Sequence, residues 1–164
     1  MTLSPVRSGD NADRAVWHLG ALIEFDATAE QTGGCFAVTR HTCRHGTAAP
    51  LHRHEREDEV FIVLAGELSV HIAGHWFRVP TGSTLFAPCG VPHAYRVESP
   101  VCRFLAVITP GGFEQWFTDT GTPAETLSLP PAPTEPPDVA LLVSAAARHN
   151  VEILGPTPDP ASAD

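Results

Sequence analysis

The feature that most constrains this chain is a run of histidines that leads into an apolar segment. Residues 46–66 read GTAAPLHRHEREDEVFIVLAG. His52 and His54 are two positions apart, and in an extended strand such residues point to the same face. Glu59 opens the apolar segment, where a carboxylate costs free energy unless a cation pairs with it. Two convergent imidazoles and one carboxylate therefore predict three ligands for a divalent metal ion.

A second stretch supplies a fourth candidate ligand. Residues 82–93 read GSTLFAPCGVPH. The pattern predicts a short strand over Ser83–Ala87 and a turn over Pro88–Gly90, because proline and glycine favour turns. His93 then opens the next strand. By contrast, His18, His41 and His45 stand at no ligand spacing and are not expected to bind the metal.

Together the two stretches resemble the motifs of the cupin family. The first has the form G-x5-H-x-H-x4-E-x6-G and the second the form G-x5-P-x-G-x2-H. The second motif often ends in asparagine four residues after its histidine, where this chain has Val97. The resemblance implies an all-β jelly-roll barrel over about residues 16–110, with a metal ion inside. It also implies that the ligands are His52, His54, Glu59 and His93.

The rest of the chain fits such a barrel. Strands of four to seven residues separated by glycine and proline turns are typical of sandwiches and closed barrels. Val16–Thr28 is expected to form one or two strands broken near Gly20, with Trp17 and Ile23 on one face and His18 on the other. A hairpin is expected over residues 68–79 and a last core strand over residues 102–108. No helical pattern is present before about residue 110.

The last third of the chain has a different character. Gly112–Asp119 predicts a short helix with three aromatic residues at helical spacing, expected to pack against the barrel or its mouth. A proline-rich linker over Leu127–Pro137 precedes a second helix, which ends near Asn150, and an edge strand over Val151–Leu154. We expect a single cupin domain over residues 1–164, with an extension from about residue 111.

The amino-acid composition limits the kinds of partner that this protein is expected to bind. The net charge is -9 and no basic cluster is present, which argues against nucleic-acid binding. The sequence contains neither the apolar core of a secretory signal near its start nor an apolar run of about 18 residues, so we expect a cytoplasmic protein with no membrane partner. We also expect a homodimer formed through the first strand or the tail, because open sheet edges need to be covered.

The predicted site suits a metal ion that keeps free coordination positions for water or substrate. Three imidazoles and one carboxylate fit Fe, Mn, Ni, Co or Zn, and ligand type alone does not choose among them. Such an ion can bind a hydroxyl or enol oxygen, and a redox-active one can bring O2 to the substrate. Strand alternation predicts an apolar substrate pocket, which favours an aromatic or enolic small molecule. The expected lining residues are Phe61, Val63, Phe86, Tyr95, Val97 and Phe104.

Within the family, the segments LHRHEREDEVFIVLAGEL, GVPHAYRV and TPGGFE resemble small single-domain cupins of the quercetin (flavonol) 2,3-dioxygenase type. That resemblance implies a dioxygenase in which Glu59 is both a ligand and the catalytic group that takes the substrate's hydroxyl proton. Two alternatives stay open. One is a non-oxidative metalloenzyme such as a polyketide cyclase or isomerase, and the other is a cupin that binds a small molecule without catalysis.

Overall fold

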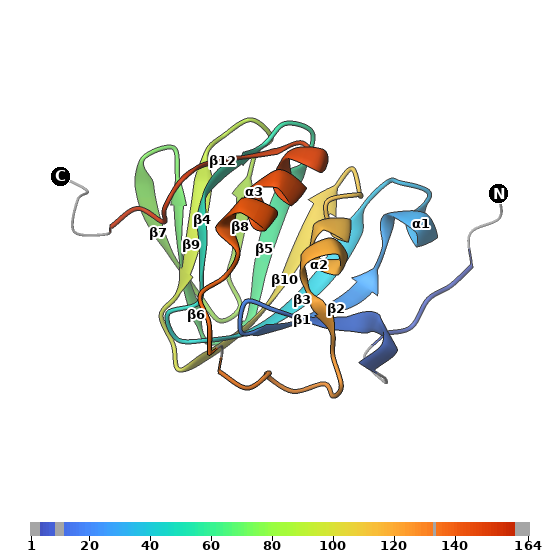
Figure 1. Cartoon of the computed structure of the whole chain (residues 1–164). Coiled ribbons are helices and arrows are strands. Elements are labelled where there is room, and N and C mark those ends of the chain that lie inside the picture. Colours follow the sequence, from blue (N-terminus) through green and yellow to red (C-terminus); the bar gives the residue numbers. More distant parts are fainter. Residues whose placement is uncertain (1–3, 9–11, 133, 160–164) are drawn as a thin grey trace.

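Two antiparallel sheets face each other across one core. The computed structural model describes residues 4–8, 12–132 and 134–159. The seven-stranded sheet has the order β11-β1-β2-β3-β10-β5-β8, and the five-stranded sheet has the order β12-β4-β9-β6-β7 (Figure 1). All strand pairs are antiparallel, which confirms the all-β fold class.

The elements follow the predicted segments closely through the barrel. The larger sheet contains β1 (Ala15–His18), β2 (Ala21–Ala27), β3 (Ala37–Arg44), β5 (Asp58–Ala65), β8 (Thr84–Ala87), β10 (Val101–Thr109) and β11 (Thr122–Pro123). The smaller sheet contains β4 (Ala48–His54), β6 (Glu67–Ile72), β7 (His75–Pro80), β9 (His93–Val97) and β12 (Val151–Gly155). The predicted hairpin is β6–β7, and β12 is the predicted edge strand. The helices are η1 (Ala12–Arg14), α1 (Ala29–Thr32), α2 (Gln115–Thr120) and α3 (Val139–Arg148).

The core lies between the sheets because apolar residues alternate along the long strands. In β3 every second residue is buried, and β10 shows the same period of two. Residues two apart in a strand share a face, so this period sends one face of each strand to the core. The most buried side chains include Phe61, Leu68, Val70, Phe104 and Ile108.

Two local expectations were wrong. The first was that no helix forms before about residue 110, because one turn of helix, α1, follows Thr28. The Gln31 side chain accepts a hydrogen bond from the Thr28 backbone N–H at 3.1 Å, which closes the helix start. Gly33 ends the helix at a φ of 66°, a left-handed conformation that glycine adopts without strain.

The second wrong expectation placed His18 on the opposite face from Ile23. Strands β1 and β2 form a hairpin in which His18 lies opposite Ala21. Leu19 and Gly20 form its two-residue turn with φ values of 48° and 81°, as a type I′ turn requires. Directly opposed residues share a face, so His18 and Ile23 both point inward, whereas Trp17 points outward with its partner Leu22.

The C-terminal extension packs on the barrel. Figure 1 shows α2 and α3 next to each other across one end of the two sheets, and the Trp116 indole N–H lies 3.4 Å from the Leu142 carbonyl oxygen. Asp138 caps α3 by accepting a hydrogen bond from the Leu141 N–H at 3.0 Å. Strand β12 then pairs with β4 at the edge of the smaller sheet.

One buried carboxylate fixes the start of α2. Glu114 is almost fully buried, and it accepts hydrogen bonds from the N–H groups of Ala29 and Gly112, both at 2.7 Å. It therefore ties α2 to α1.

In the described part of the chain, no helix has the length and apolar character needed to cross a bilayer. The predicted extent of the single domain, residues 1–164, includes positions outside the described ranges and stays a prediction.

Candidate metal centre

The four predicted ligands meet inside the barrel. His52 and His54 come from β4, Glu59 from β5 and His93 from β9. One candidate ligand atom from each lies within 4.8 Å of all the others, and all four side chains are buried. The convergence follows from the sheets, because His52 and His93 are directly opposed in the β4–β9 pair while Glu59 faces them from the other sheet.

Backbone carbonyls orient two of the imidazoles. The Nδ1 atom of His52 lies 2.8 Å from the Pro50 carbonyl oxygen, and the Nδ1 atom of His93 lies 3.0 Å from that of Val91. A carbonyl oxygen only accepts hydrogen bonds, so each Nδ1 carries the proton. Metal-bound histidines usually donate their second ring N–H in this way. The Nε2 atoms of His52 and His93 are thus the atoms left for a ligand.

His54 shows the same arrangement with a carboxylate. Its Nδ1 atom lies 3.4 Å from an oxygen of Glu57, and both side chains are buried. Its Nε2 atom is buried without a hydrogen bond, 3.5 Å from the nearest Glu59 oxygen. Buried nitrogen atoms nearly always have a partner. This unpartnered Nε2 atom, aimed at the centre of the cluster, fits a bound cation.

The electrostatics of the cluster agree with that fit. Burial lowers the pKa of His52 to about 3, so its imidazole is neutral, as a metal ligand must be. Burial alone would raise the pKa of Glu59, but the surrounding imidazoles, His54 and His93 above all, lower it to about 2. Burial would also lower the pKa of His93, whereas its 3.0 Å hydrogen bond to Glu59 raises it. The site therefore holds an ionised carboxylate that favours positive charge beside it.

Glu57 is a site residue that the sequence pattern did not reveal. It precedes the apolar segment, yet its side chain is as buried as that of Glu59: 3% of Glu57 is exposed, against 5% of Glu59. The chain bends between β4 and β5 at residues 55 and 56, which folds Glu57 back under His54. In the sequence, the available signal for Glu57 was its position three residues after the candidate ligand His54. Asp58 faces away and accepts the Cys89 N–H at 2.7 Å, as its parity predicts.

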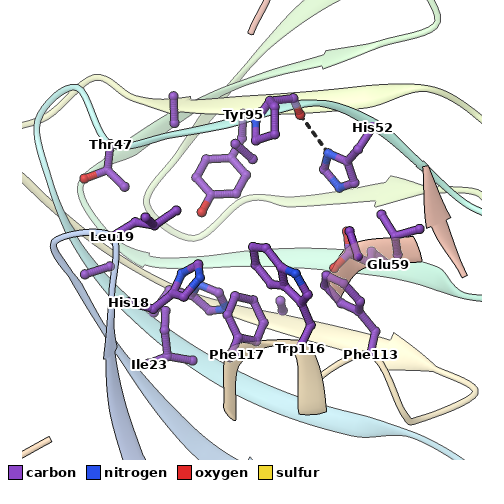
Figure 2. A pocket seen from close by; sticks show the side chains of 18 of the residues that line it. His18, Leu19, Ile23, Thr47, His52, Glu59, Tyr95, Phe113, Trp116 and Phe117 are labelled. Carbon is purple, nitrogen blue, oxygen red and sulfur yellow. Dashed lines mark hydrogen bonds between the residues drawn. The ribbon is translucent and has the colours of Figure 1, made fainter. Parts of the chain in front are cut away.

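An apolar cavity begins at the cluster. Figure 2 shows His52 and Glu59 on one side of it and His18 on the other, with aromatic side chains between. Phe61 and Tyr95, two of the residues proposed for the substrate pocket, line the cavity. The C-terminal extension supplies much of the remaining wall through Phe113, Trp116 and Phe117 of the α2 region, Ala146 of α3, and Val151 and Ile153 of β12. The expectation that the three aromatics pack against the barrel is therefore confirmed.

The other predicted pocket residues do not line this cavity. Phe86 was predicted to face the substrate but is 54% exposed. It pairs with Val60 on the outer face of the sheet, whereas its neighbours Leu85 and Ala87 oppose the inward-facing Phe61 and Glu59. Val63, Val97 and Phe104 are buried in the packed core and are absent from the described lining. Strand alternation correctly predicts that these three side chains face the barrel interior, but it does not predict whether they lie beside the cavity or in the packed core.

Comparisons with known proteins agree on the fold. A family model described as the cupin domain matches residues 39–108. Quercetin 2,3-dioxygenase of Bacillus subtilis is 27% identical over 128 residues, which cover 78% of this chain but only 38% of that protein. An uncharacterised protein of Streptomyces coelicolor is 28% identical over 91 residues, which cover 56% of this chain and 81% of that protein.

Solved structures extend the fold comparison. KdgF from a Halomonas species has a TM-score of 0.53 at 20% identity, over 58% of this chain and 85% of that one. A mutant of the Bacillus subtilis oxalate decarboxylase OxdC has a TM-score of 0.57 at 20% identity, over 69% of this chain and 32% of that one. Likenesses at this level of identity establish a shared architecture and leave the chemistry to the site itself.

Proposed function

The chain belongs to the cupin superfamily, and from that premise we propose that it is a metal-dependent dioxygenase acting on a flavonol-like or other enolic aromatic molecule. The observation that carries the proposal is the position of the cluster of three histidines and one glutamate at one end of an aromatic-walled cavity. His52, His54, Glu59 and His93 would hold one divalent transition-metal ion. Bound there, a redox-active ion supplies Lewis acidity and a means of activating O2.

The walls favour a flat, uncharged substrate. Apart from the histidines, Glu59, Thr47 and the Tyr95 hydroxyl, the described lining is apolar. Phe113 and Trp116 stack with their rings 5.5 Å apart and 14° from parallel. Such a wall binds an aromatic body and excludes water. The described residues of this wall include no arginine or lysine, so outside the metal cluster no cationic side chain is offered to a second carboxylate of a small dicarboxylate.

Glu59 is placed to accept a proton from the substrate. It is ionised, buried and within hydrogen-bond reach of His93, so a substrate hydroxyl beside it would meet a carboxylate oxygen. An enol or phenol is more acidic than an ordinary alcohol, so it gives up its proton to a carboxylate more readily, which favours an enolic substrate.

The same carboxylate favours one second candidate. Proton removal from an enolisable carbon or hydroxyl needs no oxidant, so a non-oxidative cyclase or isomerase would use the same Glu59 and the same aromatic wall. Oxygen consumption separates the two. A dioxygenase consumes O2 as substrate disappears, whereas a cyclase or isomerase turns over at the same rate without it.

The first prediction concerns metal content. Elemental analysis of the purified protein is expected to find close to one divalent transition-metal ion per chain, because four buried donors converge on one point. His52→Ala and His93→Ala are expected to lose the ion, whereas His75→Ala, which changes an exposed histidine in the β6–β7 hairpin, keeps it.

An oxygen-electrode assay of the loaded protein against a panel of enolic phenols then tests the reaction. A wild-type protein that is metal-free and binds no added Fe, Mn, Ni, Co or Zn would contradict the proposed function. A loaded protein that consumes no O2 but still converts a panel member would favour the second candidate.

A further inference from the structure

The cavity holds a second set of polar side chains away from the metal cluster. His18 of β1 and His41 of β3 line it, and only 6% and 3% of these residues are exposed. Figure 2 shows His18 on the far side of the cavity from His52 and Glu59, with Trp116 and Phe117 between them. None of the four candidate ligands is in ring contact with His18 or His41 among the described aromatic pairs.

Each of these two histidines has a buried nitrogen atom without a partner. They are Nε2 of His18 and Nδ1 of His41. The other nitrogen of His41 lies 2.9 Å from the Thr39 hydroxyl oxygen. Buried polar atoms in a folded protein nearly always have a partner, so two unpartnered atoms lining one cavity call for an explanation.

Both rings are held in place by aromatic packing. His41 stacks on Phe104 at 4.6 Å between ring centroids and 17° between planes. His18 meets the edge of Trp116 at 4.6 Å and that of Phe117 at 5.4 Å. Rings that are already oriented lose little freedom when a ligand binds, which is how a specific subsite is built.

Both imidazoles are neutral at neutral pH. Burial lowers the pKa of His18 to about 4 and that of His41 to about 3. A neutral imidazole offers one donor and one acceptor. The pair therefore suits a hydroxyl group, which both donates and accepts, better than a carboxylate or phosphate, which would need a cation. In Figure 2 the hydroxyl end of Tyr95 faces the same part of the cavity.

We propose that His18 and His41 form a hydrogen-bonding subsite for a hydroxyl group at the end of an aromatic ligand that lies away from the metal cluster. The substrate class of the proposed function, on which this inference rests, is thereby narrowed to aromatic molecules with polar oxygens at both ends. The apolar stretch between the two polar ends accommodates the ring system.

Calorimetric titration with 2-naphthol and 2-methylnaphthalene tests the subsite, because the two probes differ by a hydroxyl in place of a methyl group. Wild-type protein is expected to bind 2-naphthol about 3- to 10-fold more tightly, as one net neutral hydrogen bond predicts. His18→Phe and His41→Phe keep an aromatic ring and are expected to lose this preference, while 2-methylnaphthalene reports whether the cavity is intact.

Conservative variants sharpen the test. His18→Gln places an amide near the former Nε2 atom, and His41→Asn places one near the former Nδ1 atom, so both are expected to recover part of the preference. His75→Ala, at an exposed position of the β6–β7 hairpin, is the control and should keep it. The subsite is overturned if both Phe variants still prefer 2-naphthol over 2-methylnaphthalene. It is also overturned if the wild type binds the two probes equally or binds neither of them.

A second measurement avoids any variant. In wild-type protein labelled with ¹⁵N-histidine, 2-naphthol is expected to shift the side-chain nitrogen signals of His18 and His41 much further than 2-methylnaphthalene does, because only 2-naphthol can hydrogen-bond to them. Unshifted signals at saturating 2-naphthol would overturn the subsite. A protein that binds no metal yet prefers 2-naphthol would refute the proposed function and leave the subsite standing, whereas the reverse pattern would refute the subsite alone.

Discussion

At the scale of single residues, His54 stands between two buried carboxylates that have different tasks. Glu57 approaches Nδ1 at 3.4 Å, and Glu59 lies 3.5 Å from Nε2. A carboxylate behind a histidine fixes the ring's orientation and tautomer, and it makes the opposite nitrogen a better donor to a metal. Glu57 is therefore a positioning residue, and Glu59 belongs to the proposed ligand set itself.

Removing Glu57 is expected to weaken metal binding without removing a ligand. Outer carboxylates of this kind typically contribute 10- to 100-fold in metal affinity, so Glu57→Ala should lower the affinity by about that factor. Competition with a fluorescent chelator measures the change. Asp58→Asn is the matched control, because Asp58 is adjacent but faces away from the cluster. A folded Glu57→Ala protein with wild-type affinity would show that His54 does not depend on this contact.

At the scale of elements, α2 closes one side of the cavity, and its position depends on Glu114. That buried carboxylate accepts two backbone hydrogen bonds at 2.7 Å, one from the start of α1 and one from Gly112. Both donors would be left without this partner if the carboxylate were removed. The helix that carries Trp116 and Phe117 into the cavity is thus attached to the barrel by a polar contact as well as by packing.

The replacement Glu114→Ala is expected to lower the free energy of unfolding by about 3 kcal/mol or more, since hydrogen bonds to a charged group contribute roughly 1.5–3 kcal/mol each. Urea denaturation followed by circular dichroism measures the loss. Gln115→Ala, at the exposed neighbouring position, should change stability by less than about 0.5 kcal/mol. Equal stabilities of the two variants would show that Glu114 does not hold α2.

The strands were predictable to the extent that their alternation was uninterrupted. Strands β3 and β10 are long enough for a period of two to be read directly. The spacing of His52 and His54 placed them on one face, and the motif resemblance added Glu59 and His93. Alternation could not predict which face His18 is on, because the chain reverses at the turn formed by Leu19 and Gly20. Counting every second residue across that turn assigns the residues of β1 to the wrong face. The burial of Glu57 could not be inferred from alternation either, since a bend rather than a strand positions it.

At the scale of the whole molecule, the cavity belongs to two parts of the chain at once. The barrel contributes the four candidate metal ligands, and the extension after residue 111 contributes Phe113, Trp116, Phe117 and the inner face of β12. The aromatic residues of the extension were expected to pack against the barrel or its mouth, but the share of the cavity wall that the extension supplies was not anticipated. Local alternation describes one strand at a time and carries no information on which distant segment covers the open end of a barrel.

The expected homodimer remains a prediction, and the sheet edges narrow where it would form. Strand β1 is paired on both sides, by β11 and β2, so little of its edge is free. Among the described residues, β12 ends the smaller sheet and has an open edge, which favours the tail as the interface. Light scattering at micromolar concentration should give twice the chain mass of 17.5 kDa. A monomeric mass at that concentration would contradict the dimer.

The pairing of β12 with β4 sets an order of events during synthesis. Arg53 and Glu152, which pair across these strands, are 99 positions apart in the chain. At roughly 5–20 residues per second, a ribosome makes β12 about 5 to 20 seconds after β4. Throughout that interval one edge of β4, the strand that carries His52 and His54, lacks its final partner strand. If synthesis pauses before β12 is made, the exposed edges of β4 in neighbouring nascent chains can pair with one another. Codon choice and chaperone access between these two strands therefore bear on how much correctly closed protein a cell obtains.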